Sequence, residues 1–579
     1  MRNLFKLYKN LKPFVLLILG AIVLTYLQVM ANLELPTLMS NIVDKGIITG
    51  DIAYIWKEGA YMLLVAGGGV ICAVLASLMA VRTAIGLGRI VRNQIFEHVE
   101  HFSLHEFDKF GASTLLTRTT NDIVQIQTST IWLLTMIENA LFTSVGALIL
   151  AHSSDPQLTR ILYIALPVVA LVIIVVTSLV VPLFGLVQKQ IDKITRVVRE
   201  NITGIRVVRA FNRIDHEKDR FAHANADVTN TYIKVNRIMA VLMPLMMLLL
   251  NVVIVAVLWF GSKRIDTGDL TLGPMLAFMQ YALQILVAMI MLTVLFIQLP
   301  RSAAASDRVM AVLETKPEIA DAPEAKQIVS MTRGQVVFDN VTFSYDGGEE
   351  PALSNISFEA HAGETTAIIG GTGSGKSTLV SLIPRFYEVD SGKVLVDGVD
   401  VRELTQEDLR SRIGFVPQKA ILFTGTVADN IRYGKKDATD QEIVHAATVA
   451  QAAEFIDTMP DGYATMLSEG GLNLSGGQKQ RLGMARALVR RPEIYIFDES
   501  FSALDFKTDA NLRAALKDET RDATVIIVSQ RIGSIMNADR IVVLDEGKVA
   551  GIGTHKELMK SCEVYREIVY SQLSEEELA

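Results

Sequence analysis

Uncharged stretches dominate the first half of the chain. A helix needs roughly 20 mostly apolar residues to cross about 30 Å of hydrocarbon. Six runs are long enough and free of Asp, Glu, Lys and Arg, apart from Glu138 in the third: residues 13–33, 59–81, 131–151, 161–187, 238–262 and 270–300. We therefore expect six transmembrane helices.

The composition fits a membrane protein that does not bind nucleic acid. Half of the 579 residues are apolar, and the mean hydropathy is +0.34. The net charge of −7 argues against a generic polyanion partner. Two cysteines, Cys72 and Cys562, are too few for a disulfide framework or a cysteine-rich metal site. We expect the soluble parts to face a reducing cytosol.

The distribution of Lys and Arg predicts the orientation in the membrane. Twenty lie before the first run, between the second and third runs, and between the fourth and fifth, against five in the alternate loops. By the positive-inside rule, both termini are expected in the cytoplasm, with the chain in the plasma membrane. The first run is too long for a signal-peptide core, so we expect it to remain as a span.

Two internal basic segments read as helices rather than loops. Each has about 50 residues, few Gly or Pro, and apolar residues at helical spacing, as in Ile191, Ile194 and Val198. We expect them to continue the spans far beyond the bilayer. From Arg301 to Thr332 the hydropathy falls, which predicts a linker. The expected domains are a transmembrane domain at 1–318 and an α/β nucleotide-binding domain at 319–579.

A glycine-rich loop in the second half carries phosphate chemistry. An apolar strand at 365–369 leads into G-G-T-G-S-G-K-S-T, and a helical run follows. This is the strand–loop–helix context of a P-loop, in which backbone N–H groups surround phosphates, Lys376 reaches the terminal phosphates and Ser377 ligates Mg²⁺. A glycine-rich turn that contains Lys-Ser by chance is the alternative. The candidate ATP-binding residues are Gly370, Thr372, Gly373, Ser374, Gly375, Lys376, Ser377 and Thr378.

Two carboxylates follow a later buried strand at 494–497. Asp498 is placed to hold Mg²⁺ through water, and Glu499 to polarise an attacking water. Paired acids in this position are in isolation more often surface residues or a helix start. The P-loop upstream favours the catalytic interpretation.

Further motifs resemble the ATP-binding-cassette (ABC) proteins. Leu474-Ser475-Gly476-Gly477-Gln478 is similar to the ABC signature. Tyr345 matches the aromatic residue that stacks on adenine, Gln418 matches the Q-loop, and residues 502–505 match the D-loop. Residues 108–122 and 204–211 resemble the two cytoplasmic coupling regions of ABC exporters. The likeness covers essentially the whole chain and implies a half-transporter of the multidrug-exporter type.

The resemblance implies a dimer with shared ATP sites. Two cassettes would face each other head to tail, so that Ser475, Gly476, Gly477 and Gln478 of one chain meet the ATP held by the other. ATP would close the dimer and hydrolysis would release it. In this arrangement catalysis involves Glu499, Gln530 and Gln418, and Mg²⁺ is held by Ser377, Gln418 and Asp498.

One position departs from the family pattern. The family usually has His after the strand at 524–529, where this chain has Gln530. Glutamine donates a hydrogen bond but carries neither a proton nor a positive charge at pH 7. We interpret this chain as the weaker-site subunit of a heterodimer. A tolerated substitution within a homodimer is the alternative, because Glu499 is retained.

The membrane half offers limited information on the substrate. Glu138 is a candidate cavity residue, because a carboxylate within a span is costly and by default functional. Methionines suit a surface that repacks around varied apolar ligands, although lipid contact or helix packing explains them equally. They are Met239, Met243, Met246, Met247, Met275, Met279, Met289 and Met291.

These observations favour ATP-driven export of amphipathic drugs or similar small molecules. Transport of lipid or peptide shares every motif and is the first alternative. A membrane-anchored P-loop ATPase that acts on a soluble partner is a second, and it would not need six spans with a buried acid. Membrane lipid is an expected partner in each case.

Overall fold

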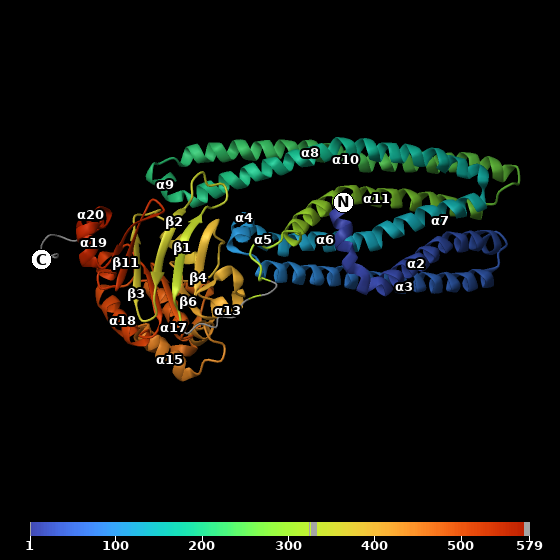
Figure 1. Ribbon diagram of the computed structural model, residues 1–579. Helices are drawn as coiled ribbons and strands as arrows, with labels where there is room; N and C mark the ends of the chain where they lie inside the picture. Colours follow the sequence, from blue (N-terminus) through green and yellow to red (C-terminus); the bar gives the residue numbers. More distant parts are fainter. Residues whose placement is uncertain (1, 323–324, 326–332, 573–579) are drawn as a thin grey trace. The chain divides into compact units, whose positions relative to one another are not determined.

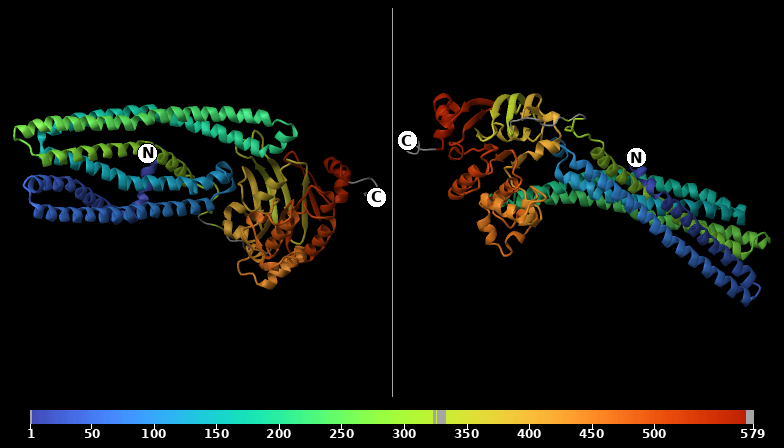
Figure 2. Two further views of the ribbon diagram at one scale, coloured as in Figure 1. Left: turned by 180° about the vertical axis from the view of Figure 1, so that it is seen from behind. Right: turned by 60° about the horizontal axis from the view of Figure 1, so that its bottom comes forward.

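The computed structural model describes residues 2–322, 325 and 333–572. The chain divides into two compact units. The first comprises Met1–His101 and Phe110–Lys316, and the second Phe102–Lys109 and Pro317–Ala579. Figures 1 and 2 show long helices in the first unit and a mixed α/β arrangement in the second.

The first unit is entirely helical in the part that the structure describes. Six helical stretches there are long and apolar enough to cross a membrane, which confirms the expected number. Its elements are α1 (Arg2–Leu7), η1 (Tyr8–Phe14), α2 (Val15–Asn41), η2 (Ile42–Ile47), α3 (Ile52–Glu100), α5 (Ala112–Thr119), α6 (Asn121–Trp132), η3 (Leu133–Ile137), α7 (Glu138–Ser154), α8 (Pro156–Thr203), α9 (Ile205–Ala210), α10 (Ile214–Asp266) and α11 (Leu272–Leu313).

Three of these helices are far longer than a bilayer is thick. Helices α3, α8 and α10 have 49, 48 and 53 residues. At 1.5 Å per residue they extend roughly 70–80 Å, against about 30 Å of hydrocarbon. The expectation that spans continue well beyond the membrane is therefore confirmed by their length. Helices α8 and α10 lie side by side with α9 between them in the chain (Figures 1 and 2), and buried Val187 and Val235 pack between the two.

In its described residues, the second unit contains three sheets and surrounding helices. Its strands are β1 (Val336–Phe343), β2 (Leu353–Ala360), β3 (Thr365–Gly370), β4 (Ser391–Val396), β5 (Val399–Asp400), β6 (Ile413–Val416), β7 (Gly425–Thr426), β8 (Met466–Leu467), β9 (Ile494–Asp498), β10 (Thr524–Val528), β11 (Arg540–Asp545) and β12 (Lys548–Gly553). Its helices are α4 (Leu104–Phe110, the last residue in the first unit), α12 (Lys376–Leu382), η4 (Val401–Glu403), α13 (Gln406–Ser411), α14 (Val427–Arg432), α15 (Asp440–Val449), α16 (Ala453–Asp457), η5 (Gly462–Ala464), η6 (Glu469–Gly471), α17 (Gly476–Leu488), α18 (Phe506–Glu519), η7 (Ile532–Ser534), α19 (His555–Ser561) and α20 (Glu563–Tyr570).

A six-stranded sheet forms the centre of this unit, in the order β12-β11-β3-β10-β9-β6. The strands from β11 to β6 run parallel, and β12 pairs antiparallel at the edge. Along β9, Ile494 and Ile496 pack into one apolar cluster with the antiparallel sheet β2-β1-β4-β5, while Tyr495 and Phe497 pack into another with α15, α17 and α18. Because both faces are covered, every residue of β9 and β10 is buried. The expected α/β fold is confirmed.

The parallel strands place their carboxyl ends at one edge of the sheet. Strands β3, β6, β9 and β10 end at Gly370, Val416, Asp498 and Val528. In open α/β sheets, ligands bind in the crevice beyond these ends. The residues that follow each strand are therefore the candidates for a ligand-binding site.

Asp155 gives a test of how the membrane unit is held together. Its carboxylate caps α8 by accepting from the backbone of Gln157 and Leu158, at 2.7 and 3.0 Å, and also accepts from Arg264 Nε at 2.7 Å. Asp155→Ala removes the cap and leaves the arginine without its partner, so we expect a loss of roughly 2–4 kcal/mol. Thermal unfolding in detergent measures this loss. Asp155→Asn keeps a capping oxygen but loses the ion pair, so a melting temperature of Asp155→Asn equal to that of the unmodified protein would contradict the role of the ion pair.

Candidate functional site

The loop after β3 has a backbone that requires glycine. Gly373 and Gly375 adopt φ values of +83° and +92°. A Cβ on Gly375 would lie 2.7 Å from Leu353 Cδ2, and one on Gly370 would lie 2.2 Å from the Leu544 carbonyl oxygen. On Gly371 and Gly373 a Cβ would meet nothing within 4 Å. The loop is thus packed tightly on one side and open on the other.

Lys376 begins α12 and is buried inside this loop. Its Nζ donates to the carbonyl oxygens of Gly370 and Gly371, at 2.9 and 2.7 Å. Burial lowers the pKa of Lys376, and the charges of Glu499 and Asp498 oppose that shift. The Ser374 hydroxyl is buried and has no hydrogen-bond partner among the described residues. A buried cation, an unpaired hydroxyl and an open loop face fit a phosphate group.

Asp498 lies at the end of β9, next to the start of α12. Its Oδ1 accepts from Ser377 Oγ at 3.0 Å. Burial raises the pKa of Asp498, as does the charge of Glu499, while the Ser377 hydrogen bond and Lys376 oppose this. A carboxylate and a hydroxyl this close are oxygen ligands of the kind that Mg²⁺ prefers.

Glu499 is held on both sides by glutamine amides. Gln418 Nε2 donates to its Oε2 at 2.6 Å, and Gln530 Nε2 donates to its Oε1 at 2.5 Å. The Glu499 backbone has φ +47°, a costly conformation that concentrates at functional sites. A cavity of about 150 Å³, lined by Glu499, Ser529 and Gln530 among others, has room for several waters.

Tyr345 extends the site toward β1. Its hydroxyl lies 2.9 Å from Thr378 Oγ1 of α12. Its ring meets Phe343 and Tyr387 edge to face, with centroids 5.0 and 5.4 Å apart, and is 44% exposed. Phe343 and Tyr387 thus fix one side of the ring beside the glycine-rich loop.

The predicted signature residues form a separate surface. Ser475 caps α17 in a capping box with Gln478: Ser475 N donates to Gln478 Oε1 at 2.9 Å, and Gln478 N to Ser475 Oγ at 3.3 Å. A Cβ on Gly476 would meet nothing within 4 Å, and one on Gly477 would lie 3.0 Å from the Ala503 carbonyl. In the described part of the chain, no hydrogen bond joins residues 475–478 to residues 370–378. One chain therefore holds two distinct candidate phosphate surfaces.

Sequence reasoning missed the connection between α4 and the tyrosine pair. Tyr387 Oη donates to Asp108 Oδ2 at 3.2 Å, and His105 Nε2 lies 3.1 Å from Asp346 Oδ2. Burial opposes ionisation of Glu106 in the same helix, but hydrogen bonds from Ser103 and the Glu318 backbone leave its pKa below the usual value. No local sequence pattern predicts the contact of Tyr387 with Asp108, because the two residues are 279 positions apart.

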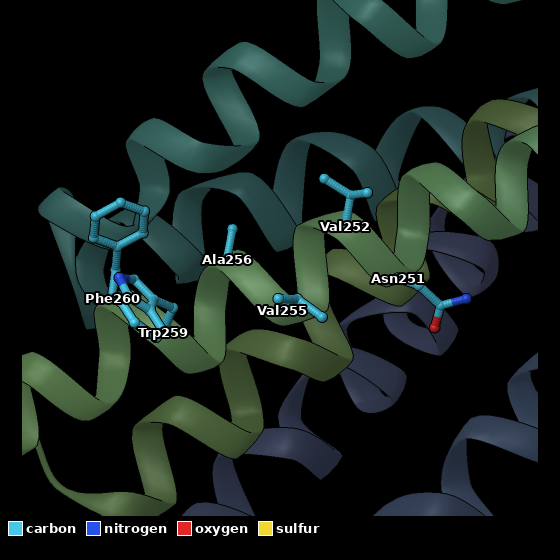
Figure 3. Close-up of a pocket in the computed structure, with 6 residues that line it drawn as sticks. All are labelled: Asn251, Val252, Val255, Ala256, Trp259 and Phe260. Atoms are coloured by element: carbon cyan, nitrogen blue, oxygen red, sulfur yellow. The ribbon is translucent and has the colours of Figure 1, made fainter.

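A shallow apolar depression of about 420 Å³ lies on the surface of the membrane unit, along α10. Figure 3 shows its lining residues, all on α10: Asn251, Val252, Val255, Ala256, Trp259 and Phe260. Exposed apolar residues along a spanning helix suit acyl chains or a neighbouring helix. This depression has no charged lining residue and adds no catalytic group.

Known proteins resemble this chain over nearly its full length. Residues 17–289 match the ABC transporter transmembrane region, and residues 353–502 match the ABC transporter family. An uncharacterized ABC transporter ATP-binding protein of Mycobacterium tuberculosis is 43% identical, covering 98% of this chain and 97% of that protein. The ATP-dependent lipid A-core flippase of Chromobacterium violaceum is 34% identical, over 84% and 82% of the two chains. The solved structure of a bacterial Atm1-family ABC exporter with ATP bound has a TM-score of 0.83 and 28% identity, covering 98% of this chain and all of that one.

Lys376 provides the direct test of nucleotide binding. Lys376→Ala removes the buried cation from the loop, so we expect roughly 100-fold weaker binding of ATP at this chain's own loop. Labelling of the chain by a photoreactive ATP analogue measures the loss. Lys556→Ala, on the exposed side of α19, is the matched control. Undiminished labelling of the Lys376 variant would contradict the assignment.

Proposed function

The chain belongs to the ABC transporter family, and from this membership we propose that it exports amphipathic small molecules as one subunit of a heterodimer. It is a half-transporter, a multi-pass plasma membrane protein whose fused ATPase domain drives export, and such exporters act as dimers. The observation that carries the proposal is the hydrogen bonding of Glu499 from two sides, next to the loop of Lys376.

Within the ATP site, each residue has a defined proposed role. The glycine-rich loop, Ser374 and Lys376 would bind the phosphates. Tyr345 would stack on the adenine, and Thr378, which lies 2.9 Å from the Tyr345 hydroxyl, would contact phosphate at the first turn of α12. Ser377, Asp498 and Gln418 would hold Mg²⁺, which would supply positive charge that offsets the charge of the phosphates. Glu499 orients a water and takes its proton, while Gln418 and Gln530 keep its two oxygens in place.

Two exposed surfaces support the proposal that this chain pairs with a second one. Ser475 and Gly477 begin a 13-residue helix, and the N-terminus of such a helix attracts anions. In the first unit, α9 buries none of its residues; its Val207 is 60% exposed, and Phe211, which follows the helix, is 74% exposed. We propose that a second cassette chain covers both surfaces, with ATP shared between one chain's loop and the other's signature. The cytoplasmic placement of both termini rests on the distribution of Lys and Arg.

Gln530 supports a heterodimer with unequal sites. Its amide reaches Glu499 at 2.5 Å, so it can position the carboxylate. It cannot carry the proton or the charge that the family's usual histidine supplies. The site built on this chain's loop would then bind ATP yet hydrolyse it slowly. The opposite site, with this chain's signature and the partner's catalytic residues, would provide most of the turnover.

Glu138 supports an amphipathic cation as substrate. Glu138 is the first residue of α7 and directly follows the π-helical turn η3; such turns are frequent at functional sites. Its Oε2 is buried and unpaired among the described residues. Methionines Met239 and Met289 pack nearby spans together, while Met243 and Met247 are exposed. A lipid substrate is the second candidate, and the 34% identity to a lipid A-core flippase favours it.

The unequal sites predict unequal effects of mutation. A positioned proton-transfer group is worth roughly 10²–10⁴-fold in rate. We expect Glu499→Gln to reduce the ATPase activity of the dimer only partly, and the equivalent change in the partner to nearly eliminate it. Steady-state phosphate release from the purified dimer measures both.

Ser475→Arg is the second variant for the same ATPase measurement, because it blocks the signature that completes the partner's ATP site. It should therefore behave like the partner change. If the chain alone forms a fully active homodimer in which Glu499→Gln stops turnover, the heterodimer proposal fails and Gln530 is a working substitute for histidine.

The proposed role of Glu138 predicts a charge-selective loss of transport. Glu138→Gln removes the negative charge, so transport of cationic substrates should fall roughly tenfold, equivalent to about 1.4 kcal/mol of lost attraction. Transport of neutral compounds into reconstituted vesicles should change little. Glu34→Gln, in α2, is the matched control. Equal losses for both substrate classes would assign Glu138 a structural role.

A further inference from the structure

The last described residue of the chain, Gln572, contacts the loop that carries Gln530. Gln572 Nε2 donates to the Gln530 carbonyl oxygen at 2.6 Å, and the Ile532 N–H donates to Gln572 Oε1 at 2.9 Å. One side-chain amide thus binds two backbone groups that are two residues apart. A side-chain amide supplies the donor and the acceptor on two separate atoms, which suits these two backbone groups.

Helix α20, which precedes Gln572, is anchored in the core by buried side chains. In α20, Tyr565 and Val569 are fully buried in the apolar cluster beneath the sheet. The Tyr565 hydroxyl lies 2.8 Å from His555 Nδ1 in α19, and Gln572 N donates to the Val569 carbonyl oxygen at 3.0 Å. Because α20 is packed in the core and Gln572 N bonds to Val569, the side-chain amide of Gln572 is held in a fixed position.

The same loop is also held by hydrogen bonds to the sheet and within the loop itself. Ser529 N donates to the Ile368 carbonyl oxygen at 3.1 Å as β10 ends, and Arg531 N donates to Ser529 Oγ at 3.0 Å. Gln530 itself points its amide to Glu499. Between buried Ser529 and buried Ile532, the two bonds from Gln572 fix the backbone from which that amide extends.

We propose that Gln572 is a positioning residue for ATP hydrolysis, acting through Gln530 on the Glu499 carboxylate. The proposal rests on the proposed function of this site in ATP hydrolysis. It links the C-terminal helix α20 to the catalytic carboxylate through one side chain and one loop. A structural role as a simple helix end is the competing explanation, and it predicts no specific effect on turnover.

Gln572→Glu is the sharpest variant, because it keeps the shape but removes the donor to the Gln530 carbonyl. Gln572→Ala removes both bonds. Ser571→Ala is the matched control, since among the described residues the Ser571 hydroxyl donates to the Ile568 carbonyl oxygen of α20 and not to the Gln530 loop. The measurement is single-turnover hydrolysis by the full dimer in excess over ATP, with the partner's catalytic carboxylate replaced by its amide, so that this chain's site is read.

We expect Gln572→Glu and Gln572→Ala to slow hydrolysis at this site roughly 10-fold, below the about 100-fold that a 1 Å misplacement can cost. ATP affinity and the melting temperature should stay unchanged, and hydrogen exchange in the segment 529–534 should become faster. In a Gln530→Ala background, the Gln572 changes should cause no further loss, because both residues act on Glu499 in series.

Three outcomes would overturn the inference: an unchanged rate, a loss that adds fully to that of Gln530→Ala, or a loss explained by weaker ATP binding or a lower melting temperature. They differ from a failure of the proposed function, in which the unmodified dimer would not hydrolyse ATP. If the unmodified dimer is active and Gln530→Ala is slow while Gln572→Glu is normal, only the inference is wrong.

Discussion

The parallel register of four strands determines where every candidate catalytic group lies. Val528 of β10 pairs with Asp498 of β9 and with Ile368 of β3, and Val416 of β6 pairs with Phe497. The residues just beyond these strand ends are the glycine-rich loop, Gln418, Glu499 and Gln530. A one-residue slip of any strand would turn its side chains to the opposite face and separate these groups. The buried apolar layers on both faces of the sheet prevent that slip.

The charges at this edge depend on one another. Burial alone would favour neutral Lys376 and neutral Asp498, as the directions of their pKa shifts indicate. Each charge stabilises the ionised form of the other, and Ser377 adds a hydrogen bond to the carboxylate. Glu499 depends instead on two neutral amide donors, which hold it without pairing its charge.

Local patterns predicted much of the architecture, and the reasons are visible in particular elements. The uncharged runs predicted the six spans, because a helix satisfies all of its backbone hydrogen bonds within one segment, and each run is long enough to cross the hydrocarbon as a helix. The glycine-rich loop predicted the end of β3 and the start of α12, since Gly373 and Gly375 need their left-handed backbone. The association of α4 with the second unit was not evident, because the contact of His105 with Asp346 and the hydrogen bond from Tyr387 to Asp108 join distant parts of the chain.

The sequence by itself determined the membrane spans, the α/β domain, the loop that fits phosphate and the two acids after β9, because each depends on neighbouring residues and on hydrophobic periodicity. Only the tertiary structure decided that Gln418 and Gln530 donate to opposite oxygens of Glu499, and that Gln572 supports the Gln530 loop. These contacts join residues 31 to 81 positions apart. The packing of the sheet brings such residues together, and no local spacing in the chain encodes that proximity.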